Sequence, residues 1–195
     1  MRAIRNILNA FRWLVLNRYI FLKIYRFKHF GSQSYIVKPL QIDGFENITI
    51  GNNVIVSSRS WMAALPLTGQ KVQLLLNDGV HLGHYNHIYA TQSIIIEKDV
   101  LTADKVYIGD NLHSYKDTTI PIAKQPIIQC KPVVIGEGSW LGENVCVIGA
   151  SVGKHSVIGA NSVVTKDIPD YCVAVGCPAR VIKRYDLNTE EWIKL

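Results

Sequence analysis

The fold of this chain is decided by Ile135-Gly136-Glu137-Gly138-Ser139-Trp140 and by the unit that follows it, Leu141-Gly142-Glu143-Asn144-Val145-Cys146. Two more units of the same kind are residues 152–157 and 158–163, and each unit starts with an aliphatic residue followed by glycine. A short fixed period indicates a repeat architecture. A period of six residues is neither the period of about 3.6 of an α-helix nor the period of about 2 of a strand. The pattern predicts a parallel β-helix, in which each unit forms one strand and one corner, and three units close a triangular coil.

The same spacing extends toward the N-terminus. Aliphatic residues that would lead a unit and point into the core, here called leaders, recur at Ile50, Val56, Leu76, Leu82, Ile88, Ile96 and Ile108. Thr102 occupies one such position as an imperfect leader, and the step from Val147 to Val152 is only five residues. The period fails in residues 57–75 and 114–131, so we expect a loop to leave the coil at each place.

Residues 3–30 are expected to be helical, because apolar residues recur there at steps of three and four. These residues are Ile4, Ile7, Leu8, Phe11, Leu14 and Val15. Residues 1–42 contain eight Lys and Arg and no Asp or Glu, whereas the rest of the chain has thirteen basic and fifteen acidic residues. The basic character therefore belongs to this segment, and Arg18 interrupts its apolar run too soon for a span of the bilayer.

The N-terminal segment has two interpretations. In the first, it caps the end of the coil and contacts other subunits, since the coils of a repeat protein need a cover at the ends. In the second, residues 1–30 contact a membrane surface, because basic residues interleaved with Trp, Tyr and Phe suit an anionic lipid interface. Nucleic acid is not expected as a partner, because the rest of the chain is close to neutral.

We divide the chain into a basic aromatic segment, residues 1–40, a repeat domain, residues 41–184, and a C-terminal tail, residues 185–195. The tail is expected to form a short helix capped by Asn188 or Thr189. The four cysteines form no CxxC pair and no secretion signal precedes them, which indicates reduced thiols and a cytoplasmic location. A position at the inner face of the membrane stays open as the alternative.

The region from residue 133 to 183 resembles the hexapeptide-repeat acyltransferases, particularly in residues 157–169 and in Val175-Gly176-Cys177-Pro178-Ala179-Arg180-Val181-Ile182. Cys177 departs from the family, which usually has Asn before this proline. The resemblance implies an all-β, left-handed parallel β-helix that assembles as a homotrimer. It covers residues 46–184 and leaves residues 1–40 without a specific counterpart.

A second resemblance is carried by Ile108-Gly109-Asp110-Asn111-Leu112-His113-Ser114-Tyr115, which is similar to the catalytic segment of sugar and polysaccharide O-acetyltransferases. It implies that His113 is the catalytic base, although Asn111 stands where that family often has a first histidine. A neutral imidazole is suited to taking a proton from an attacking hydroxyl, and a backbone N–H can stabilise the oxyanion. Neither a metal nor a covalent enzyme intermediate is required. Asp110 and Asp117 are near His113 in sequence, and whether a carboxylate assists it stays open.

The family resemblance also implies acetyl-CoA as the donor, held in a groove between two subunits. The residues that resemble its contacts are Trp140, Gly142, Ala160, Thr165, Lys166 and Arg180. Corner packing is the alternative role for Gly142 and Ala160, and subunit packing is the alternative for Trp140. Asn86 and Tyr115 are expected to bind the acceptor, with His87 as the alternative to Asn86 on the acceptor side of the cleft.

Three histidines have a spacing that suggests a metal site: His81, His84 and His87. Residues six apart lie on different sides of a three-sided coil, so His81 and His87 should diverge, and no metal site is predicted. A zinc-dependent carbonic anhydrase on the same fold is the rival that metal analysis would reveal.

The sequence therefore predicts an enzyme that moves an acetyl group from acetyl-CoA to a saccharide hydroxyl in capsule, O-antigen or exopolysaccharide synthesis. One alternative keeps the fold but transfers to another small acceptor, such as a nucleotide-linked amino sugar, a serine or an antibiotic. A second alternative is a β-helix scaffold without catalysis.

Overall fold

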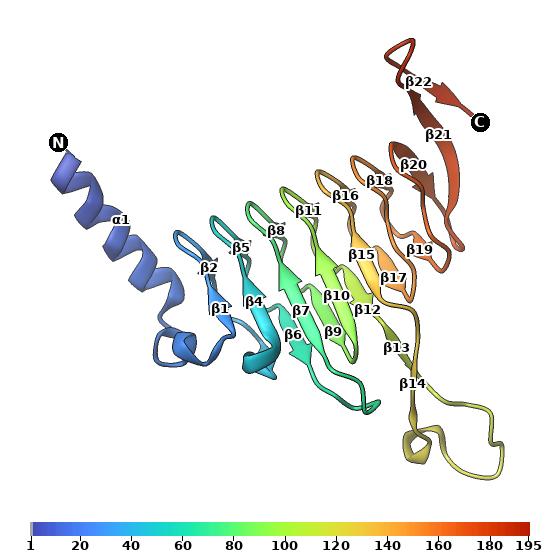
Figure 1. Cartoon of the computed structure of the whole chain (residues 1–195), viewed down its shortest axis with the longest axis horizontal. Coiled ribbons are helices and arrows are strands. Elements are labelled where there is room, and N and C mark those ends of the chain that lie inside the picture. The colour runs from blue at the N-terminus through green and yellow to red at the C-terminus, as the bar shows by residue number, and fades with distance from the viewer. Residues whose placement is uncertain (1) are drawn as a thin grey trace.

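A computed structural model describes residues 2–195 of the chain, with side chains described from residue 6 onward. The repeats form a three-sided β-helix whose axis runs along the long dimension of the molecule (Figure 1). Arg2, Ile4 and Arg5, which belong to the N-terminal pattern, have side chains outside this description. The prediction of a left-handed parallel β-helix is confirmed.

Each side of the β-helix is a ladder of short parallel strands, one strand from each coil. Sheet A contains β1 (His29–Phe30), β4 (Ile48–Ile50), β7 (Gln73–Leu76), β10 (Ser93–Ile96) and β15 (Val133–Ile135). Sheet B begins with β2 (Tyr35–Ile36), β5 (Ile55–Val56), β8 (His81–Leu82), β11 (Leu101–Thr102), β16 (Trp140–Leu141), β18 (Val157–Ile158) and β20 (Cys172–Val175). Sheet C contains β3 (Gln41–Asp43), β6 (Trp61–Ala64), β9 (His87–Ala90), β12 (Tyr107–Gly109), β17 (Cys146–Ile148) and β19 (Val163–Val164).

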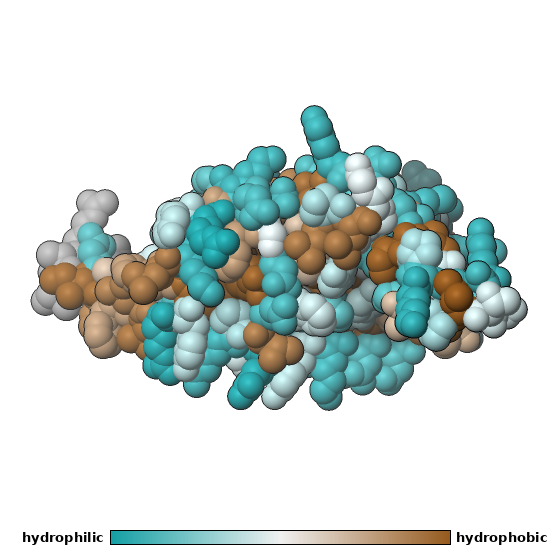
Figure 2. Space-filling model, turned by 90° about the horizontal axis from the view of Figure 1, so that it is seen from below, coloured by the Kyte–Doolittle hydropathy of each residue, from teal (hydrophilic) through white to brown (hydrophobic). Residues whose placement is uncertain are grey.

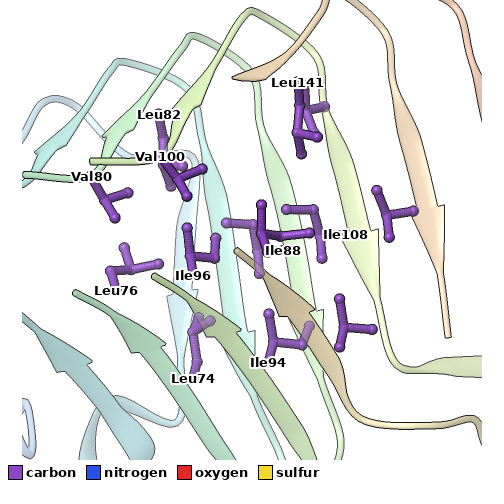
Figure 3. Packing of buried hydrophobic residues seen from close by; sticks show 14 of the residues in the cluster. Leu74, Leu76, Val80, Leu82, Ile88, Ile94, Ile96, Val100, Ile108 and Leu141 are labelled. Carbon is purple, nitrogen blue, oxygen red and sulfur yellow. The ribbon is translucent and has the colours of Figure 1, made fainter. Parts of the chain in front are cut away.

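The leaders stack in the interior of the prism (Figure 3). Every aliphatic leader predicted from the spacing is at most 1% exposed, as the six-residue period requires. Thr102, the imperfect leader, is 2% exposed, and its hydroxyl accepts a hydrogen bond from the Gly83 amide at 3.1 Å. The polar leader is therefore tolerated because a backbone donor of the preceding coil satisfies it.

The N-terminal helix is shorter than predicted. Helix α1 (Arg2–Asn17) ends where the Asn17 side chain is buried, and a 3₁₀ helix, η1 (Phe21–Arg26), follows. The Asn17 amide donates to Ser34 O at 3.0 Å, and its carbonyl accepts from Ile36 N at 2.8 Å, so the chain is fixed to β2 at this point. The prediction of helix through residue 30 is wrong, because β1 already begins the first coil at His29.

The C-terminal helix predicted from residue 188 is also wrong. Strands β21 (Arg180–Asp186) and β22 (Glu191–Lys194) form an antiparallel hairpin that extends sheet B. Tyr185 and Trp192 pack edge to face across it at 5.4 Å, and Glu190 adopts a left-handed turn conformation. Tyr185 and Trp192 both prefer strands, and their pairing across the turn stabilises the hairpin more than Asn188 or Thr189 would stabilise the start of a helix. Strand β1 starts before the predicted boundary at residue 40, and β21 continues across the one at residue 184.

The predicted loop at residues 114–131 leaves the coil as an antiparallel ribbon. Strand β13 (Asn111–His113) follows β12 and pairs with β14 (Ile127–Gln129), with a short 3₁₀ turn, η3 (Ile122–Lys124), in the connection. A further 3₁₀ turn, η2 (Phe45–Asn47), lies at the first coil. The ribbon projects from the body of the β-helix between sheets C and A (Figure 1).

Candidate active site

The base of the projecting ribbon is held by the buried side chain of Asp110. Its carboxylate accepts backbone hydrogen bonds from Thr91, Gln92 and Ser93 at 2.7–2.8 Å. The Asp110 carbonyl accepts a hydrogen bond from Cys130 N at 2.8 Å, where the chain returns to the coil. Asp110 is 0% exposed, so these charge-assisted bonds lie away from water and fix where the ribbon starts and ends.

Gln129 links the ribbon to two other segments. Its amide donates to Asp110 O at 2.7 Å, while its carbonyl oxygen accepts from the hydroxyls of Thr68 at 2.6 Å and Thr91 at 2.9 Å. Thr68 belongs to the loop between β6 and β7. The first excursion, predicted for residues 57–75, is confined to residues 65–72, because β6 and β7 already belong to the coil. The two excursions are therefore tied together by a glutamine that nothing in the repeat pattern singles out.

His113 lies at the end of β13, opposite Ile127 in the ribbon, and its side chain is exposed. The residue contributes to a cleft of about 460 Å³ on the outer face of sheet C. The ribbon supplies Asn111, Leu112, His113 and Ile127, the first excursion supplies Leu67, and sheet C supplies Trp61, His87, Tyr89 and Tyr107. The structure thus places His113 beside a recess whose floor is aromatic.

The aromatic floor is closely packed. Trp61 and His87 stack with ring centroids 4.3 Å apart and planes 7° from parallel, and Tyr89 and Tyr107 meet His87 edge to face. Trp61 is oriented by its indole N–H, which donates to the Asp43 carboxylate at 3.0 Å. The floor is therefore a preformed apolar surface with few rotational options.

His87 is a neutral member of this floor. Burial lowers the pKa of its imidazole, and its Nε2 is shielded from solvent without a hydrogen-bond partner among the described residues. Burial also raises the pKa of Tyr107, and burial together with the Asp43 carboxylate raises the pKa of Tyr89. At neutral pH all three rings are uncharged, so the floor favours an uncharged ligand.

Neither nearby carboxylate assists His113 in this structure. The oxygens of Asp110 face Thr91, Gln92 and Ser93, and Asp117 accepts from Thr119 N at 2.8 Å and from the Thr119 hydroxyl at 2.6 Å. Asn111, which replaces the first histidine of the family pattern, is 8% exposed and donates to Tyr89 O at 3.0 Å. Its role is to join the ribbon to the floor of the cleft.

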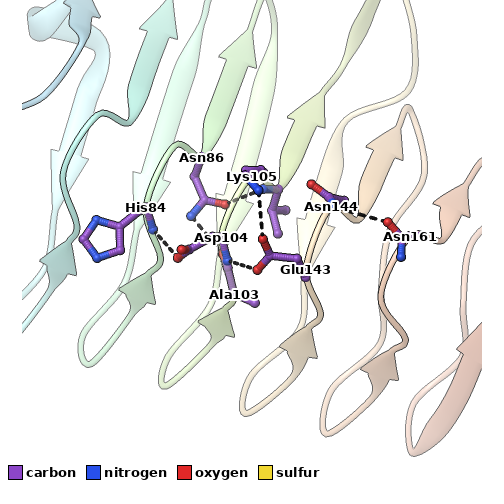
Figure 4. Close-up of polar contacts among 9 residues, drawn as sticks. His84, Asn86, Ala103, Asp104, Lys105, Glu143, Asn144 and Asn161 are labelled. Carbon is purple, nitrogen blue, oxygen red and sulfur yellow. Dashed lines mark hydrogen bonds and ion pairs between the residues drawn. The ribbon is translucent and has the colours of Figure 1, made fainter.

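The two predicted acceptor-binding residues have different positions. Tyr115 is 70% exposed, on the ribbon just beyond His113. Asn86 is 1% exposed in the corner between sheets B and C, where it donates to Gly83 O at 2.8 Å and Ala103 O at 3.1 Å and accepts from Val106 N at 3.0 Å (Figure 4). The Asn86 side chain connects consecutive coils and does not line the cleft, so its assignment to the acceptor stays a prediction.

The residues predicted to contact acetyl-CoA lie on several sides of the prism. Trp140 is 48% exposed on sheet B, next to Leu101 and Val157 in the ladder. Arg180 starts β21, also in sheet B. The structure therefore brings these two residues onto one sheet.

The remaining four predicted contacts lie at corners. Gly142 and Ala160 meet where sheet B turns into sheet C, and a Cβ on Gly142 would approach Ala160 N to 2.8 Å. Close packing between coils is thus enough to explain this glycine. Thr165 and Lys166 are exposed after β19, at the same corner as the ribbon but two coils further along sheet C.

Of the three histidines with metal-like spacing, His81 and His87 diverge, as predicted. His81 is on sheet B and His87 on sheet C, while His84 Nδ1 lies 2.9 Å from the Ser58 hydroxyl. Within the part of the chain that the structure describes, no group of three His, Cys, Asp or Glu side chains is arranged to hold a metal ion.

Apart from His87, the aromatic floor was missed in the sequence, although a pattern marks it. Trp61, His87 and Tyr107 each stand directly before a buried residue of sheet C, in three consecutive coils. Because side chains alternate along a strand, the residue before an inward leader points outward. Ring-bearing residues at that position in successive coils therefore predict a stacked outer surface.

The repeats, the three-sided coil and the cleft beside His113 define a β-helix protein of the hexapeptide type. A family model described as "Hexapeptide repeat of succinyl-transferase" matches residues 132–166. Residues 132–166 therefore carry the repeat of the hexapeptide-repeat transferases.

Individual relatives agree with this assignment. WbbJ of Escherichia coli K12, named as a putative O-acetyl transferase of lipopolysaccharide biosynthesis, is 38% identical over 128 residues, which are 62% of this chain and 65% of WbbJ. Galactoside O-acetyltransferase of the same strain is 29% identical over 74% of this chain and 70% of its own length. The chain thus spans slightly less than two thirds of the length of WbbJ.

A solved structure has the same fold. A mutant of AntD, an N-acyltransferase from Bacillus cereus in complex with dTDP and coenzyme A, superimposes with a TM-score of 0.71 over 86% of this chain and 89% of AntD. Its sequence identity to this chain is 19%, so the likeness is one of fold.

Proposed function

We propose that this protein transfers an acetyl group from acetyl-CoA to a hydroxyl of a saccharide during capsule, O-antigen or exopolysaccharide synthesis. The observation that carries the proposal is the position of His113, which lies at the edge of an aromatic cleft on a ribbon anchored by Asp110. The relatives named as O-acetyl transferases support the reaction, and the coenzyme A in the AntD structure supports the donor.

The proposed chemistry needs one base and one oxyanion donor. The His113 imidazole takes the proton of the acceptor hydroxyl as its oxygen attacks the thioester carbonyl. A backbone N–H stabilises the negative charge on the carbonyl oxygen. The carbon–sulfur bond then breaks, the new ester leaves with the acceptor, and the imidazolium returns its proton to the thiolate of coenzyme A. No residue is consumed, and the base is restored after each turnover.

We assign the binding of the donor, acetyl-CoA, to six residues: Trp140, Gly142, Ala160, Thr165, Lys166 and Arg180. Two cations in this set, Lys166 and Arg180, suit the phosphates of coenzyme A, and both are exposed. Because the six residues lie on different sides of the prism, we assign them to a groove between two copies of the chain in a homotrimer. We assign Tyr115 to binding of the acceptor, since it is exposed on the same ribbon as His113.

The acceptor is assigned to the cleft of sheet C. Sugar rings present an apolar face of C–H groups that packs well on aromatic rings, and the floor here is uncharged. Tyr89 is the ring best placed to test this role, since it lines the cleft and its neighbour in the ladder on β6 is the small residue Ala63. The proposed location is the cytoplasm, at the inner face of the membrane when the acceptor is linked to lipid.

The decisive experiment is thiol release from acetyl-CoA by the full chain, with a panel of saccharides as acceptors. Release that depends on the saccharide, with an acetyl ester found on the product, is the expected result. Release that occurs only with nucleotide-linked amino sugars, giving an amide, would replace the proposal by N-acylation. No release with any saccharide, amino sugar, serine or antibiotic would favour a scaffold and contradict the proposal.

Replacing Tyr89 by alanine is expected to raise the KM for the saccharide by about tenfold and to leave the KM for acetyl-CoA unchanged, since aromatic contacts contribute about 0.5–1.5 kcal/mol. Steady-state kinetics with each substrate varied in turn measure both constants. Tyr85→Ala is the matched control, because Tyr85 is 57% exposed at a corner outside the cleft. An equal rise in both constants would show that the cleft does not belong to the acceptor alone.

A further inference from the structure

The apolar side of helix α1 faces away from the β-helix. The residues of this side, here called the apolar stripe, are 42–68% exposed: Ile7, Leu8, Phe11, Leu14 and Val15. The opposite side faces the first coil, where Asn17 is fully buried against β2 and Trp13 lines a cleft of about 460 Å³ with Tyr35. A helix that served only as a cap would turn its apolar stripe toward the first coil. In this structure the apolar stripe faces away from the coil instead.

The chain continues the exposed apolar surface beyond the helix. Tyr19, Phe21, Leu22 and Tyr25 are 47–83% exposed, and they lie at the turn and in η1 directly after α1. Figure 2 shows hydrophobic side chains gathered at the N-terminal end of the molecule, next to hydrophilic ones. Tyrosine rings favour the headgroup level of a bilayer. The exposure of Tyr19 and Tyr25 therefore suits contact with a membrane surface.

The charge of the same segment is entirely positive. Its described cations are Arg12, Arg18, Lys23, Arg26, Lys28 and Lys38, and residues 1–42 hold no Asp or Glu. Among the side chains from residue 6 onward, the ion pairs are Lys105–Glu143 and Lys131–Asp167. None of these six cations is therefore neutralised by a carboxylate within the described chain.

We propose that α1 lies on the surface of a bilayer rich in anionic lipid, with the apolar stripe at the boundary between headgroups and acyl chains. Arg12 and Arg18 are exposed, and their guanidinium groups lie over the rings of Tyr35 and Tyr19 rather than against a carboxylate. Charge favours lipid over a second copy of this helix, because two such helices would bring like charges together. The described part of the chain contains no helix that is long and apolar enough to cross a membrane. The arrangement is that of a helix lying in the interface.

Because α1 is attached to the first coil, a helix bound to lipid would also position the β-helix. Asn17 bonds to Ser34 O at 3.0 Å and to Ile36 N at 2.8 Å, so the end of the helix does not swing freely. Helix binding therefore holds the β-helix near the lipid, within reach of an acceptor in the membrane. The lipid contact itself does not depend on the acetyl transfer proposed above.

The test is flotation of the full chain with vesicles of phosphatidylcholine mixed with phosphatidylserine, and with vesicles of phosphatidylcholine alone. Binding to the mixed vesicles is expected to exceed binding to the neutral ones and to fall as salt is raised, because ions screen surface charges. Equal binding to both kinds of vesicle, or none to either, would overturn the proposal.

Variants locate the contact. Replacing Leu8 and Phe11 together by serine is expected to weaken vesicle binding by about tenfold or more. Arg12→Gln and Arg18→Gln should each weaken it by about fivefold. Asn9→Ser, on the side opposite the stripe, is the control and should bind as the native chain does. Acetyl transfer to a water-soluble saccharide should be the same in all of them, so failure of one proposal is distinguishable from failure of the other.

The oligomeric state of the Leu8 and Phe11 double variant completes the test. Sedimentation should give the same assembly as the native chain if the apolar stripe contacts lipid. A variant that dissociates would show that the stripe is buried between copies, and that result would overturn the lipid assignment. A double variant that keeps both its assembly and its vesicle binding would also overturn it.

Discussion

His113→Ala is expected to reduce acceptor-dependent thiol release by about 100- to 10,000-fold, the usual contribution of a positioned general base. The imidazole is the titratable group that the ribbon places at the edge of the cleft, and neither Asp110 nor Asp117 is free to replace it. The rate constant kcat for a saccharide acceptor is the quantity to measure. Binding of acetyl-CoA should change little, because the base acts on the acceptor.

Two controls make this result interpretable. His29→Ala changes an exposed histidine in the first coil and should leave kcat unaffected. The oligomeric state of His113→Ala should match that of the native chain, because an exposed side chain on the ribbon contributes little to folding. If kcat stays within a factor of about three of the native value, another group is the base and the site must be reassigned.

Asp110→Ala is expected to lower the free energy of unfolding by about 3–5 kcal/mol, as for the loss of a buried charged partner. The substitution leaves three backbone N–H groups, those of the buried Thr91 and the half-buried Gln92 and Ser93, without acceptors. It also removes the anchor at the base of the ribbon, so activity should fall with stability. Unfolding by denaturant, followed by circular dichroism, measures the change.

Asp117→Ala is the matched control for this prediction. Asp117 is also a carboxylate that accepts backbone and hydroxyl hydrogen bonds, but it is exposed on the connection between β13 and β14. Its loss should cost about 1 kcal/mol or less, the usual range for surface positions. Equal losses for the two variants would mean that the buried hydrogen bonds of Asp110 are not what stabilises the corner.

The leaders of the core could be predicted from spacing, whereas Met62 and Leu74, which are also fully buried, fall in the range predicted to be a loop. Leu76, Leu82 and Ile88 were placed in the interior by their six-residue steps, and each is at most 1% exposed. The prediction succeeds because every coil must bury its leaders against the coils above and below, whatever the loops do. The same local pattern also placed His81 and His87 on different sides of the prism.

Segments without repeats were predicted less well, because their structure depends on what they contact. The helix at residues 3–30 ends early since Asn17 bonds to Ser34 and Ile36 in the first coil. Asn86 looked available for a substrate, but its amide connects two coils in a corner. A side chain that bonds to backbone groups of another coil has no sequence pattern that reveals those partners.

The sequence by itself determined the β-helix, the inward leaders, the two excursions and the concentration of positive charge in residues 1–42, because all of these follow from period and composition. Only the tertiary structure decided that both excursions meet at Gln129 and that His113 borders a floor of aromatic rings. It also decided that the apolar stripe of α1 faces away from the coil. These features join residues from different coils, and their positions depend on packing between segments that the local pattern does not encode.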